Sequence, residues 1–273
     1  MLRLAVLTGA SAVALGGMAF AADLPINAPP PVYNWTGFYA GLNGGYHWGE
    51  TSMAFTGTDT DGLVFGSGLG VAQQFGVIPL TGTSSASGFI GGGQFGYNYQ
   101  INSFVLGLEF DIDGATGSKN ASVSLTNVPE GFVAPTSTQS AQQLDWLGTL
   151  RGRIGWTPID RVLIFGTGGF AFGHSNASFS VFNPQAEPPL YASAYSAASV
   201  GWTAGGGIEC ALAERWTNWS VKVEYLYYDL GQKTGTVTYQ NLDLNNLPEF
   251  STLSGEIRHN GNIVRAGLNY KFN

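Results

Sequence analysis

The chain has 273 residues, of which 44% are hydrophobic and only 11% are charged, and its formal net charge is −7. The charged share lies far below the roughly 25% of a soluble domain, and the acidic balance argues against nucleic acid as a partner. With 40 Gly residues and 13% aromatic residues, the composition suits many short strands rather than helices.

The first 21 residues have the pattern of a secretory signal peptide. Arg3 gives a positive start, residues 4–17 are uncharged, and Ala19-Phe20-Ala21 is a small-residue cleavage site. We therefore expect cleavage before Ala22. The alternative is an N-terminal membrane helix, but the uncharged run is short of the about 20 apolar residues that such a helix requires.

Residues 22–34 contain Pro25 and the run Pro29-Pro30-Pro31, which predicts an extended periplasmic linker. No later segment has the length and apolar character of a membrane helix. The longest apolar stretch, residues 162–172, is interrupted by glycines. A chain that faces lipid without long apolar runs has one other solution, the closed β-barrel, in which side chains alternate between lipid and lumen.

Alternation of apolar and polar residues recurs eight times after the linker. The predicted strands are residues 35–48, 88–100, 104–113, 143–156, 162–173, 200–212, 219–229 and 259–272. Residues 104–113 alternate most cleanly, because three carboxylates occupy successive positions of one face. In residues 143–156 we expect Leu144 to face outward and Asp145 inward. Residues 162–173 are apolar on both faces, so their facing stays open.

The predicted fold is therefore all-β: an eight-stranded antiparallel up-and-down transmembrane barrel over residues 35–273. Three connections are short (residues 101–103, 157–161 and 213–218) and four are long (49–87, 114–142, 174–199 and 230–258). Outer-membrane barrels have short periplasmic turns and long extracellular loops, so both chain ends should lie on the periplasmic side. Seven tryptophans map to strand ends and predict aromatic girdles: Trp35, Trp156, Trp216 and Trp219 at the periplasmic end, and Trp48, Trp146 and Trp202 at the outer end.

Charged residues of the predicted strands fall on the lumen-facing positions. They are Glu109, Asp111, Asp113, Asp145, Arg151, Arg153, Glu209, Lys222, Glu224, Arg265 and Lys271. Side chains alone fill the lumen of an eight-stranded barrel, so these charges need partners. They predict an internal salt-bridge network that plugs the lumen, with Arg151 and Arg153 facing Glu109 and Asp111. The alternative is a narrow ion path whose selectivity the charges set.

Four stretches resemble a known family. They are Ala-Asp-Leu-Pro at residues 22–25, Trp-Thr-Gly-Phe-Tyr-Ala-Gly at 35–41, Gly-Thr-Gly-Gly-Phe-Ala-Phe-Gly at 166–173, and Val-Arg-Ala-Gly-Leu-Asn-Tyr-Lys-Phe at 264–272. Together they resemble the outer-membrane immunogenic protein family of alphaproteobacteria, often labelled porin family. The resemblance implies an abundant surface antigen with an OmpA-like barrel, and some members are described as hemin-binding. One departure is that the terminal aromatic residue, Phe272, is followed by Asn273.

Two of the three histidines, His47 and His259, fall on lumen positions at the outer ends of neighbouring strands. They are either solvated rim residues or contacts for hemin or a transition metal at the mouth. No local signature marks a catalytic nucleophile, so we do not expect an enzyme. The single cysteine, Cys210, lies in an apolar strand pattern and is interpreted as a small buried or lipid-facing residue.

The sequence thus predicts a non-enzymatic outer-membrane protein that strengthens the envelope and presents loops to the surroundings. Outer-membrane lipid and lipopolysaccharide are the expected partners, with hemin or a host-surface ligand at the loops. No cofactor and no structural metal are expected. Two alternatives remain open: a hemin-binding protein and a narrow channel for small solutes or ions.

Overall fold

The computed structural model describes residues 33–59, 81–124, 137–183, 186–242 and 248–272. The predicted signal peptide and most of the predicted linker lie outside these residues. The elements are β1 (Gly37–Asp59), β2 (Thr81–Ile101), β3 (Phe104–Ala115), β4 (Ser118–Ser124), β5 (Ser137–Ile159), β6 (Val162–Asn183), β7 (Ala186–Ala211), a 3-10 helix (Glu214–Trp216), β8 (Trp219–Leu242) and β9 (Pro248–Lys271). Among the described residues, none belongs to a helix long and apolar enough to cross a membrane.

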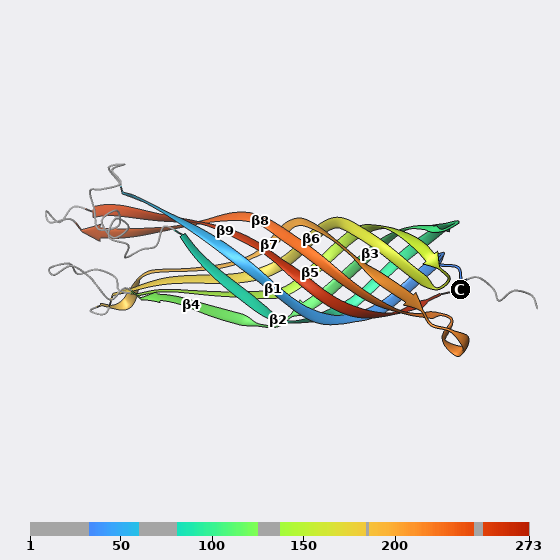
Figure 1. The fold of residues 1–273 in the computed structure, drawn as a ribbon. Coiled ribbons are helices and arrows are strands. Elements are labelled where there is room, and N and C mark those ends of the chain that lie inside the picture. Colours follow the sequence, from blue (N-terminus) through green and yellow to red (C-terminus); the bar gives the residue numbers. More distant parts are fainter. Residues whose placement is uncertain (1–32, 60–80, 125–136, 184–185, 243–247, 273) are drawn as a thin grey trace, which may run out of the picture. The chain divides into compact units, whose positions relative to one another are not determined.

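The strands form a closed antiparallel barrel (Figure 1). Neighbours pair in the order β3-β2-β1-β9-β8-β7-β6-β5-β4, and β3 also pairs with β5. Both β3 and β4 pair with β5 in one continuous direction, from Phe104↔Trp156 to Ser124↔Ser137, so they are one strand with a break at Thr116 and Gly117. The barrel therefore has eight strands, and the predicted fold is confirmed.

One end of the barrel, which we call the lower end, carries tight turns at the predicted short connections. Asn102 and Arg161 adopt positive φ values of 54° and 67° between β2 and β3 and between β5 and β6. Asparagine tolerates this left-handed conformation better than most residues. The third connection contains the short 3-10 helix Glu214–Trp216. The opposite end is the upper end.

The strands reach much further toward the upper end than we predicted. Strand residues occupy 49–59, 81–87, 118–124, 137–142, 174–183, 186–199, 230–242 and 248–258, all assigned above to long loops. The loop prediction was wrong there because Ser, Thr, Gly and Ala dominate these segments and give weak hydrophobic alternation. Thr and Tyr nonetheless favour strands, and β7 alone has 26 residues. A membrane-spanning strand needs only about 9–11 residues.

The barrel divides toward its upper end. The β7–β8 ladder ends at Trp202↔Asp229 and the β2–β3 ladder ends at Ile90↔Ala115, although β7, β8 and β2 all continue. Beyond these points β2-β1-β9-β8 pair as one sheet and β4-β5-β6-β7 as another. We call them the first and second upper sheets. A register shift after Asp229, with Gly231 at φ 75°, marks the point where β8 leaves β7.

Large apolar side chains cover the outside of the barrel wall. Those that are exposed include Phe38, Leu42, Phe89, Phe95, Leu108, Ile112, Ile154, Phe170, Val200, Ile208, Val223 and Leu268. The structure also assigns the faces of β6: Leu163, Phe165 and Ala171 are buried on the lumen side, whereas Ile164 and Phe170 are exposed. An apolar exterior of this extent is the surface expected of a barrel in lipid.

Buried side chains fill the lumen in three layers. The lower apolar layer consists of Trp35, Val105, Leu163, Phe165 and Ala211, with Tyr33 packed against it. The upper apolar layer consists of Ile90, Leu144, Leu147, Ala171, Leu226, Tyr228, Leu230 and Ile263. Buried polar and charged residues of the same strands occupy the height between them.

Candidate functional site: a buried ion-pair network in the lumen

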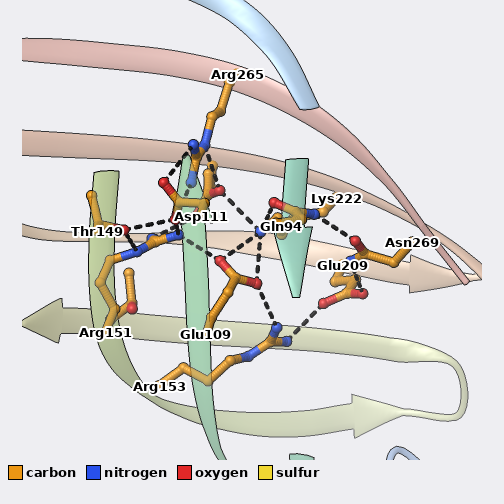
Figure 2. A network of polar contacts seen from close by, with 12 residues as sticks. Gln94, Glu109, Asp111, Thr149, Arg151, Arg153, Glu209, Lys222, Arg265 and Asn269 are labelled. Carbon is orange, nitrogen blue, oxygen red and sulfur yellow. Dashed lines mark hydrogen bonds and ion pairs between the residues drawn. The ribbon is translucent and has the colours of Figure 1, made fainter. Parts of the chain in front are cut away.

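Nine charged side chains from five strands meet between the two apolar layers (Figure 2). They are Glu109, Asp111 and Asp113 on β3, Arg151 and Arg153 on β5, Glu209 on β7, Lys222 and Glu224 on β8, and Arg265 on β9. None is more than 5% exposed. The strand alternation places all of them on the lumen face, as the sequence predicted. We call them the lumen network.

Glu109 accepts hydrogen bonds from three strands. The Lys222 Nζ atom lies 2.9 Å from both carboxylate oxygens, and the Arg151 Nη2 atom lies 2.5 Å from Oε1. The Tyr39 hydroxyl donates to Oε2 at 2.7 Å. Two cations and a phenol thus replace the water that this carboxylate gives up on burial.

Arg151 spreads its guanidinium over three carboxylates. Besides Glu109, its Nη2 atom lies 2.7 Å from Asp111 Oδ2, and its Nη1 atom lies 3.0 Å from Glu224 Oε2. The expected contacts of Arg151 with Glu109 and Asp111 are therefore confirmed. They follow from the ladder, in which Arg151 is the direct partner of Glu109 on the neighbouring strand.

Arg265 closes the network on the opposite wall. Its Nε atom donates to Glu224 Oε1 at 2.8 Å, its Nη2 atom lies 3.0 Å from Asp111 Oδ2, and its Nη1 atom contacts Asp113. Five carboxylates in the lumen network thus meet four cations. Asp113 is the least satisfied of the five, because its Oδ1 atom is buried without a hydrogen-bond partner among the described residues.

Arg153 links the lumen network to the lower apolar layer. It donates to Glu209 Oε2 at 2.7 Å and to the Tyr39 hydroxyl at 3.0 Å. Its guanidinium carbon lies 4.5 Å from the centre of the Phe165 ring, where a cation–π attraction adds to the hydrogen bonds. Of the predicted partners of Arg153, Glu109 lies 3.5 Å away, and no contact with Asp111 is among those that the structure shows.

Two predicted members of the lumen network lie elsewhere. Asp145 is the extra residue of a β-bulge between Leu144 and Trp146 and accepts a hydrogen bond from Asn176. The bulge reverses the alternation, so Leu144, predicted to face outward, is 1% exposed in the upper apolar layer. Lys271 lies at the lower end, where it donates to the Asn34 carbonyl. The Asp145 prediction assumed an uninterrupted strand alternation, whereas Lys271 keeps its predicted parity opposite Tyr39 but lies away from the other charges.

The sequence reasoning missed the neutral members of the site. Gln94 accepts a hydrogen bond from Lys222 at 2.9 Å, Thr149 donates to Asp111 at 2.7 Å, and Ser220 and Asn269 donate to Glu209 at 2.6 and 2.8 Å. Their lumen-facing positions in the alternation were a usable signal.

Trp35 does not belong to the lower aromatic girdle. It is 3% exposed and packs edge-on against Tyr33, with ring centres 4.9 Å apart. The Trp35 amide donates to Gln100 and the Tyr33 amide donates to Asp160, so segments from two tight turns hold this stretch across the lower end. Burial raises the pKa of the Tyr33 phenol to about 12. Among the other girdle residues, Trp48, Trp156, Trp202 and Trp216 are exposed, and Trp146 and Trp219 are partly buried.

The two lumen-side histidines do not form a matched pair at the mouth. His47 is 1% exposed, and its Nε2 atom donates to the Thr116 carbonyl at 2.9 Å. His259 pairs with Thr51 in the β1–β9 ladder, so the two histidines differ by four ladder positions, a rise of about 13 Å along the strand. His47 is thus closed off from a ligand outside, and a hemin contact by His259 stays a prediction. Among the described residues, no group of three or more His, Cys, Asp or Glu side chains is arranged to hold a metal ion.

A closed barrel with an apolar exterior and a lumen filled by paired charges defines the protein as an outer-membrane β-barrel. Residues 7–272 match the family described as "Outer membrane protein beta-barrel domain". The chain belongs to this family and is an outer-membrane protein.

Relatives from alphaproteobacteria agree with the predicted resemblance. The chain is similar to the 31 kDa outer-membrane immunogenic protein of Brucella melitensis, with 33% identity over 98% of this chain and 97% of the relative. It is also similar to the 22 kDa outer membrane protein of Rhizobium leguminosarum, with 26% identity over 89% of this chain and 80% of that protein. Among solved structures, Neisserial surface protein A matches 87% of this chain and 98% of its own, with 13% identity and a TM-score of 0.37.

Replacing Arg151 with Ala should destabilise the barrel strongly. The substitution leaves Glu109, Asp111 and Glu224 buried beside one cation fewer, and breaking a buried ion pair typically costs about 3–5 kcal/mol. We expect a lower urea midpoint, measured by heat-dependent gel mobility of the protein in lipid vesicles. Arg215→Ala, at an exposed site of the 3-10 helix, is the control. An unchanged midpoint for Arg151→Ala would show that these contacts do not stabilise the fold.

The lumen network holds one carboxylate more than it holds cations, and Asp113, whose Oδ1 atom lacks a hydrogen-bond partner among the described residues, is the carboxylate whose charge should be easiest to remove. Asp113→Asn leaves four carboxylates with four cations, and Arg265 keeps Asp111 and Glu224. We expect the free energy of unfolding to stay equal or rise. Asp111→Asn should lower it by about 1–3 kcal/mol, because Arg151, Arg265 and Thr149 all lose a charged acceptor. Equal losses for the two variants would contradict this charge assignment.

Proposed function

We propose that this protein is a sealed, non-enzymatic barrel that reinforces the outer membrane and presents its upper strands to the surroundings. One observation carries the proposal: three consecutive layers of buried side chains fill the lumen from end to end. An ion path needs a continuous hydrated route, whereas here two apolar layers enclose the charges. The same filling supports a structural rather than a conducting role for the lumen network.

The non-enzymatic part of the proposal rests on two supports. The similar proteins are named for immunogenicity and for their place in the outer membrane. His47 also lacks the setting of a catalytic base, because its ring donates a hydrogen bond to a backbone carbonyl inside the wall. The apolar exterior supports membrane lipid and lipopolysaccharide as the partners of the wall.

The sealed lumen is tested by electrical recording. The refolded protein, inserted into a planar lipid bilayer, should give no discrete conductance steps. Insertion is verified by adding protein whose folded state has been checked by heat-dependent gel mobility, and by recovering it from the membrane afterwards. Reproducible steps that change size in Glu109→Gln would assign the lumen network to an ion path and overturn the sealed-barrel proposal.

Surface display of the upper end is tested in intact cells. Thr234 lies exposed on an upper strand and Thr217 lies exposed in a lower turn. In a Cys210→Ser background, Thr234→Cys should react with a membrane-impermeant maleimide, and Thr217→Cys should react only after the cells are lysed. Short turns of outer-membrane barrels face the periplasm, which gives the reason for the difference. The reverse labelling pattern would show that the upper end of the barrel faces the periplasm.

A further inference from the structure

The five carboxylates of the lumen network are not equally well supplied with donors. Four of them interact with three donor residues each. These donors are Tyr39, Arg151 and Lys222 for Glu109; Thr149, Arg151 and Arg265 for Asp111; Arg153, Ser220 and Asn269 for Glu209; and Arg151, Lys222 and Arg265 for Glu224. Asp113 has one donor among the described residues, Arg265, and its Oδ1 atom has none.

Asp113 also has the least polar surroundings of its own strand's three carboxylates. It lies at the top of the lumen network, where its ladder partner on β5 is Leu147 of the upper apolar layer. Ile90 of the same layer lies one lumen-facing position above Gly92, the partner of Asp113 on β2. Asp113 is 1% exposed. An ionised carboxylate at this height would face side chains that cannot donate hydrogen bonds, which disfavours the charge.

A second polar side chain, the amide of Asn43 on β1, lies beside Asp113. Asn43, Gly92 and Asp113 share one row of the ladder, and the glycine between them has no side chain. A Cβ atom at Gly92 would lie 2.6 Å from Asp113 Oδ1, so this oxygen lies over Gly92. Asn43 is 9% exposed, and neither its Oδ1 nor its Nδ2 atom has a hydrogen-bond partner among the described residues.

Other charged side chains reach Asp113 from β3, β8 and β9. Arg265 attracts a charge on Asp113, whereas Asp111 and Glu224 repel it. Arg265 is divided among all three carboxylates. The remaining cations of the lumen network contact other carboxylates; they are Arg151, Arg153 and Lys222. One attraction, shared three ways, therefore opposes the burial and both repulsions.

The strands β1, β2 and β5 supply no further positive charge to this corner of the lumen network. The lumen-facing positions of β2 and β5 near Asp113 hold Ile90, Gly92, Gln94, Leu147 and Thr149. On β1, His47 lies two lumen-facing positions above Asn43. The Nδ1 atom of His47 is buried without a partner among the described residues. A proton added there would leave a charged N–H group unpaired.

We propose that Asp113 carries a proton in the folded barrel at neutral pH and donates it in a hydrogen bond to Asn43. The acid hydroxyl at Oδ1 donates to the amide oxygen, and Oδ2 still accepts from Arg265. Rotating the amide by half a turn exchanges its oxygen and nitrogen, so Asn43 can present the acceptor. The proton also removes the excess charge, because four carboxylates then meet four cations.

A protonated Asp113 makes the barrel most stable in acid. The unfolded chain ionises its aspartates above their ordinary pKa of about 3.9, so folding above that pH takes up one proton. The stabilisation is complete below this pH and decreases as the pH rises, until Asp113 ionises in the folded barrel as well. The proposal rests on the filled lumen of the proposed function, but conductance steps would contradict only the sealed lumen, whereas the measurements below report on Asp113 itself.

The first test is urea unfolding of the full-length protein in lipid vesicles between about pH 5 and pH 7, above the ordinary pKa of aspartate. Relative to Asp113→Asn, the folding equilibrium constant of wild type should fall about tenfold per pH unit, the effect of one proton. The histidines titrate in both proteins, so the comparison isolates Asp113. Asp160→Asn, at a half-exposed carboxylate of a lower turn, is the matched control and should keep the wild-type pH dependence.

The second test detects the proton by infrared spectroscopy. Folded protein in micelles of lauryldimethylamine oxide, a detergent without carbonyl groups, should show the C=O band of a protonated carboxylic acid at neutral pH. Asp113→Asn should lack this band and Asp160→Asn should keep it. Asn43→Leu should move the band to higher frequency, because the acid hydroxyl then loses its acceptor. Folding of every variant is checked by heat-dependent gel mobility.

Three results would overturn the proposal. The first is that wild type and Asp113→Asn have the same infrared spectrum in the region of protonated carboxylic acids. The second is that the two proteins have the same pH dependence of unfolding. The third is a higher stability in sodium chloride than in N-methylglucamine chloride at equal ionic strength, abolished by Asp113→Asn, which would assign the site to a metal cation instead of a proton.

Discussion

Every inward-facing side chain of an eight-stranded barrel must share a space that side chains alone can fill. Charges in that space are out of bulk water, and an unpaired one would cost several kcal/mol. Ladder register decides which charges meet, since direct partners on neighbouring strands share a face. Glu109 beside Arg151, Glu209 beside Lys222 and Glu224 beside Arg265 are all direct ladder partners. The lumen network is therefore a consequence of register, and a slip of one residue in any of these strands would turn its charges toward lipid.

The many glycines belong to the same constraint. A Cβ atom at Gly96 would lie 2.5 Å from the Tyr39 ring, and one at Gly107 would lie 2.9 Å from the Arg153 side chain. A Cβ at Gly45 would come within 2.6 Å of the Cβ of Arg265. Long arginine and tyrosine side chains can thus cross the lumen only because glycine, which has no side chain, occupies the facing positions. The abundance of Gly and the presence of large buried ions are one packing solution, in which small and large residues alternate around a narrow barrel.

The alternation in the sequence was enough to predict the number of strands, their antiparallel order, the tight turns and all nine members of the lumen network. It was not enough where regular pleating is broken. The bulge at Asp145 carries no composition signal, and it moved Leu144 inside and Asp145 out of the network. Trp35 precedes β1 and is placed by long-range contacts to Gln100 and Tyr33, which no local pattern encodes. The upper strands were missed because Ser, Thr, Gly and Ala dominate them, so that their sequence resembles that of loops.

Because the lumen is sealed, the stability of the barrel and the surface presented by the upper strands depend on different residues. With Trp35 closing the lower end and Leu147, Leu226 and Ile263 closing the upper one, what happens above the barrel does not depend on passage through it. The lumen network can then be optimised for stability alone, while the upper sheets are free to vary. The strands that form those sheets are continuous with the barrel wall, but the β7–β8 and β2–β3 ladders that close the wall end below them. The sequence of the upper strands can therefore change without opening the barrel below them.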